Sequence, residues 1–249
     1  MSEKKPLQFC LLQARKQDDP VRIDERLSFA ERMDVSLEQV DVWDLLSGAP
    51  DIDRLESEYD GLLVGGSGDY STTDPEPWIK GFIDTMGMIC DRRIPTFASC
   101  FGFQGMVISQ GGTVRRDEAA AEVGTYELER VQSLDDDPLF GHLPHRFVAQ
   151  QGHKDRVIDM PSGLENLIRS ERCPYQAVRV KESLVYGVQF HPELTGAENK
   201  ARFARYYETY VDALGYDATQ QIMKSFMASP DANEILLRFK NAVLDSSSD

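Results

Sequence analysis

Hydrophobic positions in the N-terminal half form short runs separated by segments of helical spacing. The run at 7–14 is mainly apolar and the run at 61–64 contains no polar side chain, which is typical of strands buried on both faces. Shorter strands are predicted at 37–45, where apolar and polar residues alternate, and at 93–99. Between these runs, residues 22–33 have helical spacing, and a second helix is predicted from Asp74-Pro75 to about Cys90, with Asp74 as its N-cap. The alternation predicts an α/β fold: a flavodoxin-like, doubly wound, mostly parallel sheet with helices on both faces.

The pattern changes after Gly124. Short β-like segments follow to about Gln189, at 124–131, 145–152, 156–160, 165–170, 175–180 and 183–190. They predict a small antiparallel addition of strands and hairpins packed on the main sheet. Beyond Pro192 we expect helices at 198–214, 219–227 and 231–244, with a fraying tail at 245–249. The expected organisation is a domain over 1–195 and a C-terminal helical extension over 196–249 packed on that same domain.

Composition and charge restrict the class of protein. A hydrophobic content of 41% and a charged content of 28% are typical of soluble globular proteins. No apolar run reaches the roughly 20 residues of a membrane span, and the short apolar stretch near the N-terminus predicts a buried strand rather than a signal peptide. A net charge of −15 disfavours a nucleic-acid partner. The four cysteines are scattered, which favours the reducing cytoplasm over a disulfide framework or a structural metal site.

One cysteine lies at a predicted bend between a strand and a helix. The stretch PTFASCFGFQGM (Pro95–Met106) places Cys100 between small residues, in the arrangement of a nucleophile elbow. The helix N-terminus at this position favours the thiolate. The alternative interpretation is a buried structural cysteine, and for Cys10, Cys90 and Cys173 we prefer that interpretation.

A cysteine nucleophile needs a base, and the base needs an orienting group. His191 follows the apolar run YGVQF, and Glu193 lies two residues further on, across a proline. If that run is a central strand, His191 emerges at the same sheet edge as Cys100. The alternative is a loop histidine beside an incidental acid.

Together, the segments ASCFGFQG, GVQFHPE and LLVGGSG resemble the class I (triad-type) glutamine amidotransferases over roughly Leu7 to Leu194. The segment QGHKDRVIDMPSG is most similar to the branch related to the amidotransferase portion of GMP synthase. The resemblance implies a triad of Cys100, His191 and Glu193 that hydrolyses the side-chain amide of glutamine through a γ-glutamyl thioester. It implies no cofactor and no metal.

The resemblance also implies roles for residues around the triad. Backbone N–H groups of Gly66 and Phe101 would form the oxyanion hole, and Gly65, Gln104 and His153 would bind substrate. For His153, a purely structural hydrogen-bonding role is an open alternative. The chain departs from the family pattern where Ala98 replaces glycine in the elbow and where Ser67 replaces the proline of the glycine turn. Without that proline we expect a flexible turn.

Other conspicuous residues receive structural interpretations. We interpret Trp43 and Trp78 as core or anchor residues and the acidic Asp135–Pro138 as a solvated turn. The apolar stripe in the last predicted helix (Ile235, Leu236, Phe239 and Val243) is more typical of a core than of an interface.

The expected function is glutamine hydrolysis in the cytoplasm, with ammonia passed to a separate synthase subunit, because the sequence contains no nucleotide-binding loop of a synthetase. Its partners would be glutamine or another γ-glutamyl compound and that synthase, with neither nucleic acid nor membrane. A γ-glutamyl peptide hydrolase that acts without a partner is the alternative, and a non-enzymatic regulatory protein of the same fold is a third hypothesis.

Overall fold

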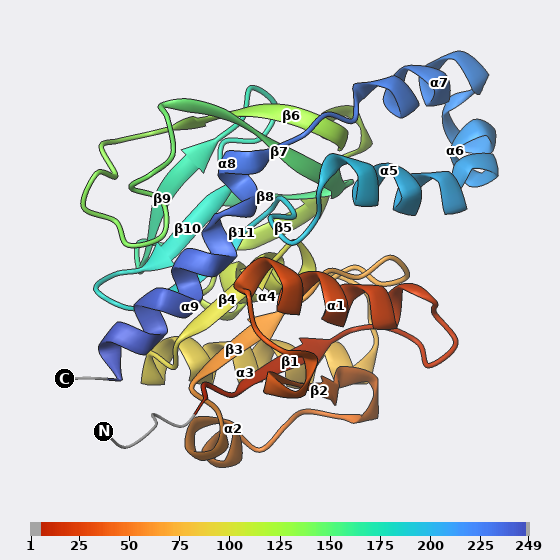
Figure 1. Ribbon diagram of the computed structural model, residues 1–249. Coiled ribbons are helices and arrows are strands. Elements are labelled where there is room, and N and C mark those ends of the chain that lie inside the picture. The colour runs from red at the N-terminus through yellow and green to blue at the C-terminus, as the bar shows by residue number, and fades with distance from the viewer. Residues whose placement is uncertain (1–5, 248–249) are drawn as a thin grey trace.

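The computed structural model describes residues 6–247, and within this range its centre is a nine-stranded sheet of order β2-β1-β3-β4-β11-β10-β9-β6-β7. The parallel half contains β1 (Phe9–Gln13), β2 (Val40–Asp44), β3 (Gly61–Val64), β4 (Thr96–Ser99) and β11 (Val185–Val188). The order 2-1-3-4 with β11 in the fifth place is the flavodoxin-like arrangement, so the predicted fold class is confirmed (Figure 1).

Helices cover both faces of this sheet, and side chains alternate between two cores. Along β1, Phe9 and Leu11 face the core beneath α1 (Val21–Met33) and α9 (Ile235–Ser246). The neighbouring Cys10 and Leu12 face the core beneath α3 (Pro77–Arg92) and α4 (Phe101–Ser109). The short α2 (Ile52–Glu58) adds Ile52 and Leu55 to this second core.

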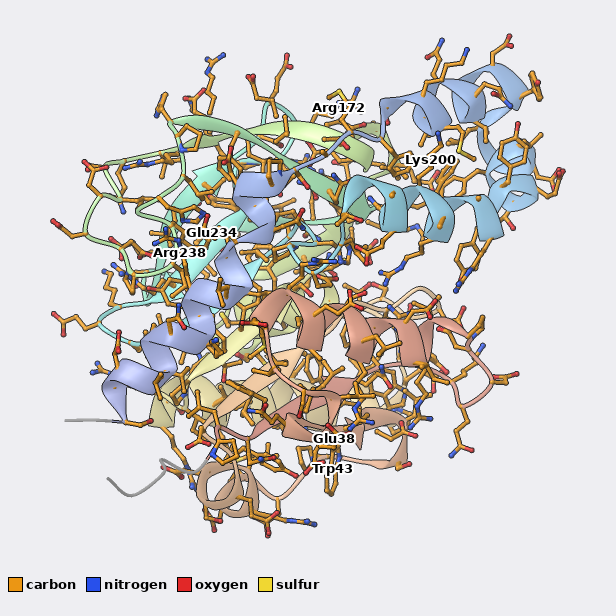
Figure 2. The ribbon with its side chains drawn as sticks, in the orientation of Figure 1. Glu38, Trp43, Arg172, Lys200, Glu234 and Arg238 are labelled. Atoms are coloured by element: carbon orange, nitrogen blue, oxygen red, sulfur yellow. The ribbon has the colours of Figure 1, made fainter. Side chains whose placement is uncertain are left out.

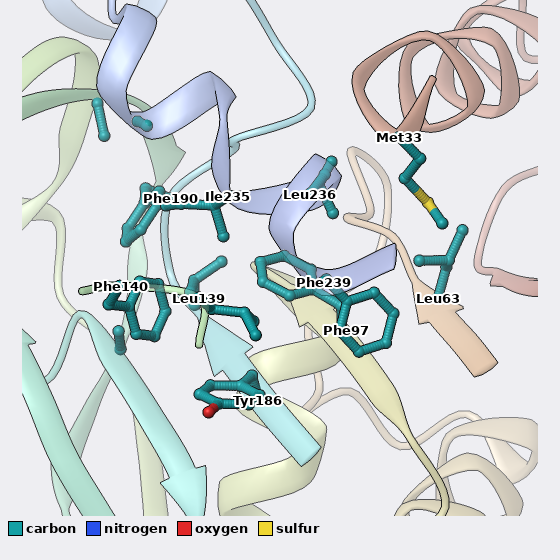
Figure 3. Close-up of a cluster of buried hydrophobic side chains, with 14 of the residues drawn as sticks. Met33, Leu63, Phe97, Leu139, Phe140, Tyr186, Phe190, Ile235, Leu236 and Phe239 are labelled. Atoms are coloured by element: carbon teal, nitrogen blue, oxygen red, sulfur yellow. The ribbon is translucent and has the colours of Figure 1, made fainter. Parts of the chain in front are cut away.

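The last helix belongs to the core, as its apolar stripe predicts. Ile235, Leu236, Phe239 and Val243 are fully buried. Figure 3 shows Phe239 beside Phe97 of β4, and their ring centroids lie 5.8 Å apart. The stripe is therefore occupied within the chain.

The middle strands are antiparallel, as predicted, but their position differs. β6 (Glu122–Arg130), β7 (Arg146–His153), β9 (Leu164–Arg169) and β10 (Ala177–Val180) extend the main sheet edge to edge instead of packing on it. β8 (Asp155–Asp159) pairs with β5 (Thr113–Arg116), a strand that the pattern did not predict, in a separate two-stranded sheet. Alternation of apolar and polar residues along a strand indicates which face is buried, but it does not identify the neighbouring strand. The sequence therefore predicted the strands but not that they continue the main sheet.

The start of α3 is a second correction. The helix begins at Pro77, with Glu76 in the N-cap position, and not at Asp74-Pro75. Asp74 instead accepts a hydrogen bond from the backbone N–H of Ser71 in the preceding turn, at 2.7 Å. Both prolines fit the preference for the first helical position, and the sequence alone does not choose between them.

The C-terminal helices are more broken than predicted. The segment 198–214 forms α5 (Gly196–Arg205) and α6 (Tyr207–Leu214), 219–227 corresponds to α7 (Tyr216–Ser225), and 231–244 is divided into α8 (Pro230–Asn233) and α9. In Figure 1, α5 lies beside α1, and α6 and α7 project beyond the sheet. Of the tail, residues 245 and 246 are helical, and residues 248–249 lie outside the described part of the chain.

The acidic turn at Asp135–Pro138 is not simply solvated. Asp135 is exposed, but Asp137 is only 8% exposed and accepts hydrogen bonds from Arg179 at 2.8 Å and from the Tyr186 hydroxyl at 3.1 Å. The solvated interpretation is therefore wrong for Asp137, because partners distant in sequence satisfy its charge.

The two tryptophans are packing residues, as predicted. Trp43 belongs to β2 (labelled in Figure 2) and donates its indole N–H to the Gly48 carbonyl at 2.9 Å. Trp78 packs against Phe101, with ring centroids 5.8 Å apart. Among the helices of residues 6–247, none is long and apolar enough to cross a membrane.

Candidate active site

Cys100 lies at the turn between β4 and α4, where the sequence predicts an elbow. Its backbone has φ 50° and ψ −101°, a conformation that non-glycine residues rarely adopt. The Cys100 N–H donates to the Val188 carbonyl at 2.8 Å, and its carbonyl accepts the Gln104 N–H at 3.0 Å. These bonds to β11 and α4 hold the strained residue in place, and its side chain stays 7% exposed.

His191 and Glu193 approach the cysteine from the adjacent strand. β11 runs parallel to β4, so the residues that follow both strands emerge at one sheet edge. The Nδ1 atom of His191 is 2.6 Å from Oε1 of Glu193, and the Cys100 side chain lies close enough to the ring to raise its pKa. Because Nδ1 is occupied by Glu193, Nε2 is the ring nitrogen left available to Cys100.

Electrostatics favour a charged histidine in this pair. Burial opposes the charged forms of His191 and Glu193, but their mutual attraction outweighs it, so that the pKa of His191 is raised and the pKa of Glu193 is lowered. Burial also raises the pKa values of the Cys10, Cys90 and Cys173 thiols to about 12. These three cysteines are buried packing residues, as predicted, and they stay protonated near neutral pH.

Two glycines border the His191 ring. A Cβ on Gly66 would lie 3.0 Å from Cε1 of His191 and 3.6 Å from Cβ of Cys100. A Cβ on Gly152 would lie 3.7 Å from Nε2 of the same ring. The glycine turn after β3 therefore lies directly against Cys100 and His191, and a larger residue at position 66 would displace the imidazole ring.

A buried ionic network, which the sequence analysis missed, lies behind this turn. Glu25 is fully buried and accepts hydrogen bonds from Arg15 at 2.8 Å and from Gln13 at 2.9 Å. Its carboxyl carbon would lie 2.6 Å from a Cβ on Gly65, so the carboxylate fills the space that the glycine leaves. The sequence does contain one indication of this network. Glu25 lies four positions from Val21 and from Phe29, so an acidic residue occupies the apolar stripe of α1.

The triad opens into a cleft of about 450 Å³. One wall comes from the glycine turn and α4, and the opposite wall comes from α5 and α6 with Asn199, Arg202, Phe203, Tyr206 and Tyr210. Of the predicted site residues, Gly66, Phe101, Gln104 and His153 line this cleft beside Cys100 and His191. Gly65 lies behind the turn, against Glu25.

Gln104 and His153 are held by protein partners. The Gln104 side-chain amide donates to Oε1 of Gln189 at 3.1 Å and to the Asp155 carbonyl at 3.2 Å. The two ring nitrogens of His153 lie 3.0 Å from the Asp155 carbonyl and 3.0 Å from Oε2 of Glu122. Both ring nitrogens of His153 and the side-chain amide of Gln104 therefore already have protein partners.

A group of potential metal ligands overlaps with this network. Glu122, His153 and Cys173 are buried, and their potential ligand atoms lie within 4.8 Å of one another. Gln176 also donates to Oε2 of Glu122 at 2.6 Å. Hydrogen bonds therefore already occupy both His153 nitrogens and one Glu122 oxygen, an arrangement that stabilises the sheet edge beside the cleft.

Known proteins are similar to this chain in sequence. The sequence profile of the family "Glutamine amidotransferase class-I" matches residues 28–207. A glutamine-hydrolyzing GMP synthase subunit of Methanocaldococcus jannaschii is 30% identical over 181 residues, which are 72% of this chain and 89% of that protein. The glutamine-hydrolyzing GMP synthase of Thermosipho melanesiensis is 35% identical over 136 residues, 55% of this chain but only 25% of that protein, so the chain spans about a quarter of this longer relative.

Solved structures agree in fold. A glutamine amidotransferase from Thermotoga maritima aligns with a TM-score of 0.70 and 21% identity over 94% of this chain and 96% of that one. A glutamine amidotransferase from Methylobacillus flagellatus aligns with a TM-score of 0.72 and 18% identity over 97% and 95%. The family match covers more than half of the sequence and includes Cys100, His191 and Glu193, so the chain belongs to the class-I glutamine amidotransferase family.

Proposed function

We propose that this chain hydrolyses the side-chain amide of glutamine through a γ-glutamyl thioester on Cys100 and supplies the ammonia to a synthase partner. The observation that carries the proposal is the grouping of three side chains: Cys100 and His191 line a cleft that also contains the glycine turn, and Glu193 holds Nδ1 of His191 at 2.6 Å. A thiol, an imidazole and an orienting carboxylate in this order are the components of nucleophilic acyl transfer.

In the first half-reaction, His191 takes the thiol proton and the sulfur of Cys100 attacks the carboxamide carbon. The resulting tetrahedral intermediate collapses as its C–N bond breaks, and the proton on His191 passes to the departing ammonia. Glu193 fixes the orientation of the imidazole and stabilises its charged form through the 2.6 Å bond to Nδ1. The product is a thioester between Cys100 and the γ-carbonyl.

In the second half-reaction, His191 takes a proton from water, and the hydroxide attacks the thioester carbonyl. The C–S bond breaks, glutamate leaves, and the Cys100 thiolate recovers the proton from His191. Both tetrahedral intermediates carry negative charge on oxygen, and the backbone N–H groups of Gly66 and Phe101 are the proposed donors to it. The first belongs to the turn against His191, and the second begins α4, where the helix dipole adds positive potential.

A γ-glutamyl peptide is the second candidate substrate. One observation favours it: the cleft has a volume of about 450 Å³ and extends from the triad to Phe203, Tyr206 and Tyr210. Space next to the scissile amide would admit a leaving group larger than ammonia, and the same triad chemistry would release it.

The decisive experiment is a substrate panel. The purified chain is incubated with glutamine and with γ-glutamyl dipeptides, and glutamate and ammonia are both quantified. We expect glutamate and ammonia in equal amounts from glutamine, and no product from Cys100→Ser, because a serine hydroxyl is far less ionised than a thiol near neutral pH. Cys90→Ala is the matched control, since Cys90 is a buried thiol of α3 that does not line the cleft.

Addition of candidate synthases separates the two substrates. Stimulation of glutamine turnover by a synthase, chiefly through kcat, supports the amidotransferase proposal, because an ordered oxyanion turn acts on the transition state. Efficient cleavage of one γ-glutamyl peptide, far above glutamine and unchanged by every synthase, would replace that proposal with the peptide hydrolase.

A further inference from the structure

Arg202 lines the cleft from α5, opposite the glycine turn. The helix is fixed on both sides: Glu198 and Arg205 form ion pairs with Arg32 and Asp24 of α1 at 3.2 Å and 2.8 Å. On the sheet side, the buried Asn199 donates to the Gln151 carbonyl of β7 at 3.2 Å. Arg202 lies three residues after Asn199, on the same helix face, so a rigid support presents its side chain to the cleft.

Arg202 has no hydrogen bond or ion pair with any residue in the described range 6–247. The other basic residues of the cleft do have partners: Arg15 pairs with Asp19 and Glu25, Arg116 pairs with Glu118, and Lys154 lies over the Tyr210 ring at 5.7 Å. Burial and the nearby Arg15 lower the pKa of Arg202, and the attraction of Glu193 and Glu25, neither of which forms an ion pair with it, does not offset them.

A half-buried guanidinium without an ion pair has lost part of its favourable hydration. Binding of an anion compensates for this loss. The γ-glutamyl donor of the proposed reaction carries such an anion: its α-carboxylate, at the end of the side chain opposite the scissile amide. The planar guanidinium matches a carboxylate in bidentate geometry. We propose that Arg202 binds the α-carboxylate of the γ-glutamyl substrate and thereby selects donors in which this group is free; this inference rests on the proposed function.

Arg202 could also act through Glu193 of the proposed triad. It interacts electrostatically with Glu193, whose Oε2 atom is buried without a hydrogen-bond partner. An arginine that acted through Glu193 would change the pKa values of Glu193 and His191. Its effect on the rate would then be the same whether or not the substrate carries a free α-carboxylate. The two roles therefore differ in how the loss of Arg202 depends on the substrate.

The test is a cycle of two variants and two substrates. Glutamine and glutamine α-methyl ester contain the same scissile amide, but the ester lacks the α-carboxylate. For Arg202→Met we expect kcat/KM on glutamine to fall about 10- to 150-fold, the range for a lost hydrogen bond to a charged group. The loss should reside mainly in KM, and activity on the ester should change less than about threefold. Arg202→Lys keeps the positive charge but cannot donate two parallel hydrogen bonds to a carboxylate. Its kcat/KM on glutamine should therefore lie between those of the wild type and Arg202→Met.

Arg205→Met is the matched control, because Arg205 lies on the same helix, is exposed and does not line the catalytic cleft. It should leave both substrates unchanged. Circular dichroism and the denaturant midpoint confirm that each variant is folded.

An activity-independent measurement completes the test. Glutamate binding to Cys100→Ala, measured by calorimetry, should weaken by the same factor when Arg202→Met is added. Equal losses on glutamine and ester, with a shifted pH profile, would overturn the proposal in favour of action through Glu193. Unchanged kinetics and unchanged glutamate affinity would also overturn it. If the wild type hydrolysed neither substrate, the proposed function would fail, and glutamate binding would still decide the role of Arg202.

Discussion

Replacement of Glu25 should impair catalysis although this residue lies outside the triad. Its carboxylate is fully buried against Gly65, and Arg15 and Gln13 hold it at 2.8 Å and 2.9 Å. Through Gly65 it supports the turn that carries the proposed oxyanion donor of Gly66. Glu25→Gln keeps the volume but removes the charge, so that the amide can turn its NH₂ group towards Arg15 and push the turn out of register.

The size of the effect follows from these contacts. Loss of one partner of a buried pair costs about 3–5 kcal/mol of the free energy of unfolding, and we expect the lower end because Asp19 still pairs with Arg15 at 3.1 Å. A domain with about 5–15 kcal/mol of stability remains folded. Loss of one oxyanion donor lowers kcat about 10²–10³-fold, and a displaced donor should cost at least about tenfold. KM should change little, because the donor acts on the transition state.

The assay combines urea denaturation with steady-state glutamine hydrolysis. Asp137→Asn is the control, because Asp137 also forms a buried ion pair, with Arg179 at 2.8 Å, but does not line the cleft. Both variants should lose stability, and only Glu25→Gln should lose kcat. A Glu25→Gln enzyme with reduced stability and wild-type kcat would refute the argument that Glu25 supports the turn.

Three further predictions concern the triad. Gly66→Ala should lower kcat about tenfold, since its Cβ would lie 3.0 Å from Cε1 of His191 and displace the ring by tenths of an ångström; unchanged kcat would count against this contact. Glu193→Gln should move the alkaline limb of the kcat/KM–pH profile to lower pH. The Glu193 carboxylate raises the pKa of His191, and the alkaline limb reports the loss of the proton that His191 passes to the leaving group. An unchanged alkaline limb would mean that another group titrates there. A diazo-ketone analogue of glutamine should label Cys100 first among the cysteines by peptide mapping, and prior labelling of Cys173 would contradict the assigned nucleophile.

The parallel half of the sheet and the proximity of Cys100 and His191 could be predicted from the sequence for the same physical reason. Continuous apolar runs indicate strands buried on both faces, and the ends of such parallel strands meet at one edge. Cys100 and His191 each follow an apolar run, so their proximity could be inferred without coordinates. The register of β4 and β11 then fixes how they meet.

The sequence could not indicate which charges are buried. Asp137 is separated from Arg179 by 42 positions, and Glu25 has its partners on another element, so neither pair leaves a local pattern. Both residues occur where local rules predict solvent or an apolar side chain. A charge at such a position indicates that a partner exists, and the fold determines which residue it is.

The cleft illustrates the same limit for function. The proposed triad lies at one wall of the cleft, and the opposite wall is formed by α5 and α6, whose break at Tyr206 was not predicted. Tyr206 lies near this break, and its hydroxyl would be 4.0 Å from a Cβ on Gly68, as would Nη1 of Arg15. The turn is thus flanked at Gly68 by Arg15 of the loop after β1 on one side and by Tyr206 of the C-terminal helical segment on the other. These helices also carry Arg202, the residue proposed to bind the substrate's α-carboxylate. On that proposal, substitutions in α5 that leave Cys100, His191 and Glu193 in place should alter the choice of substrate more than the rate of the chemical step.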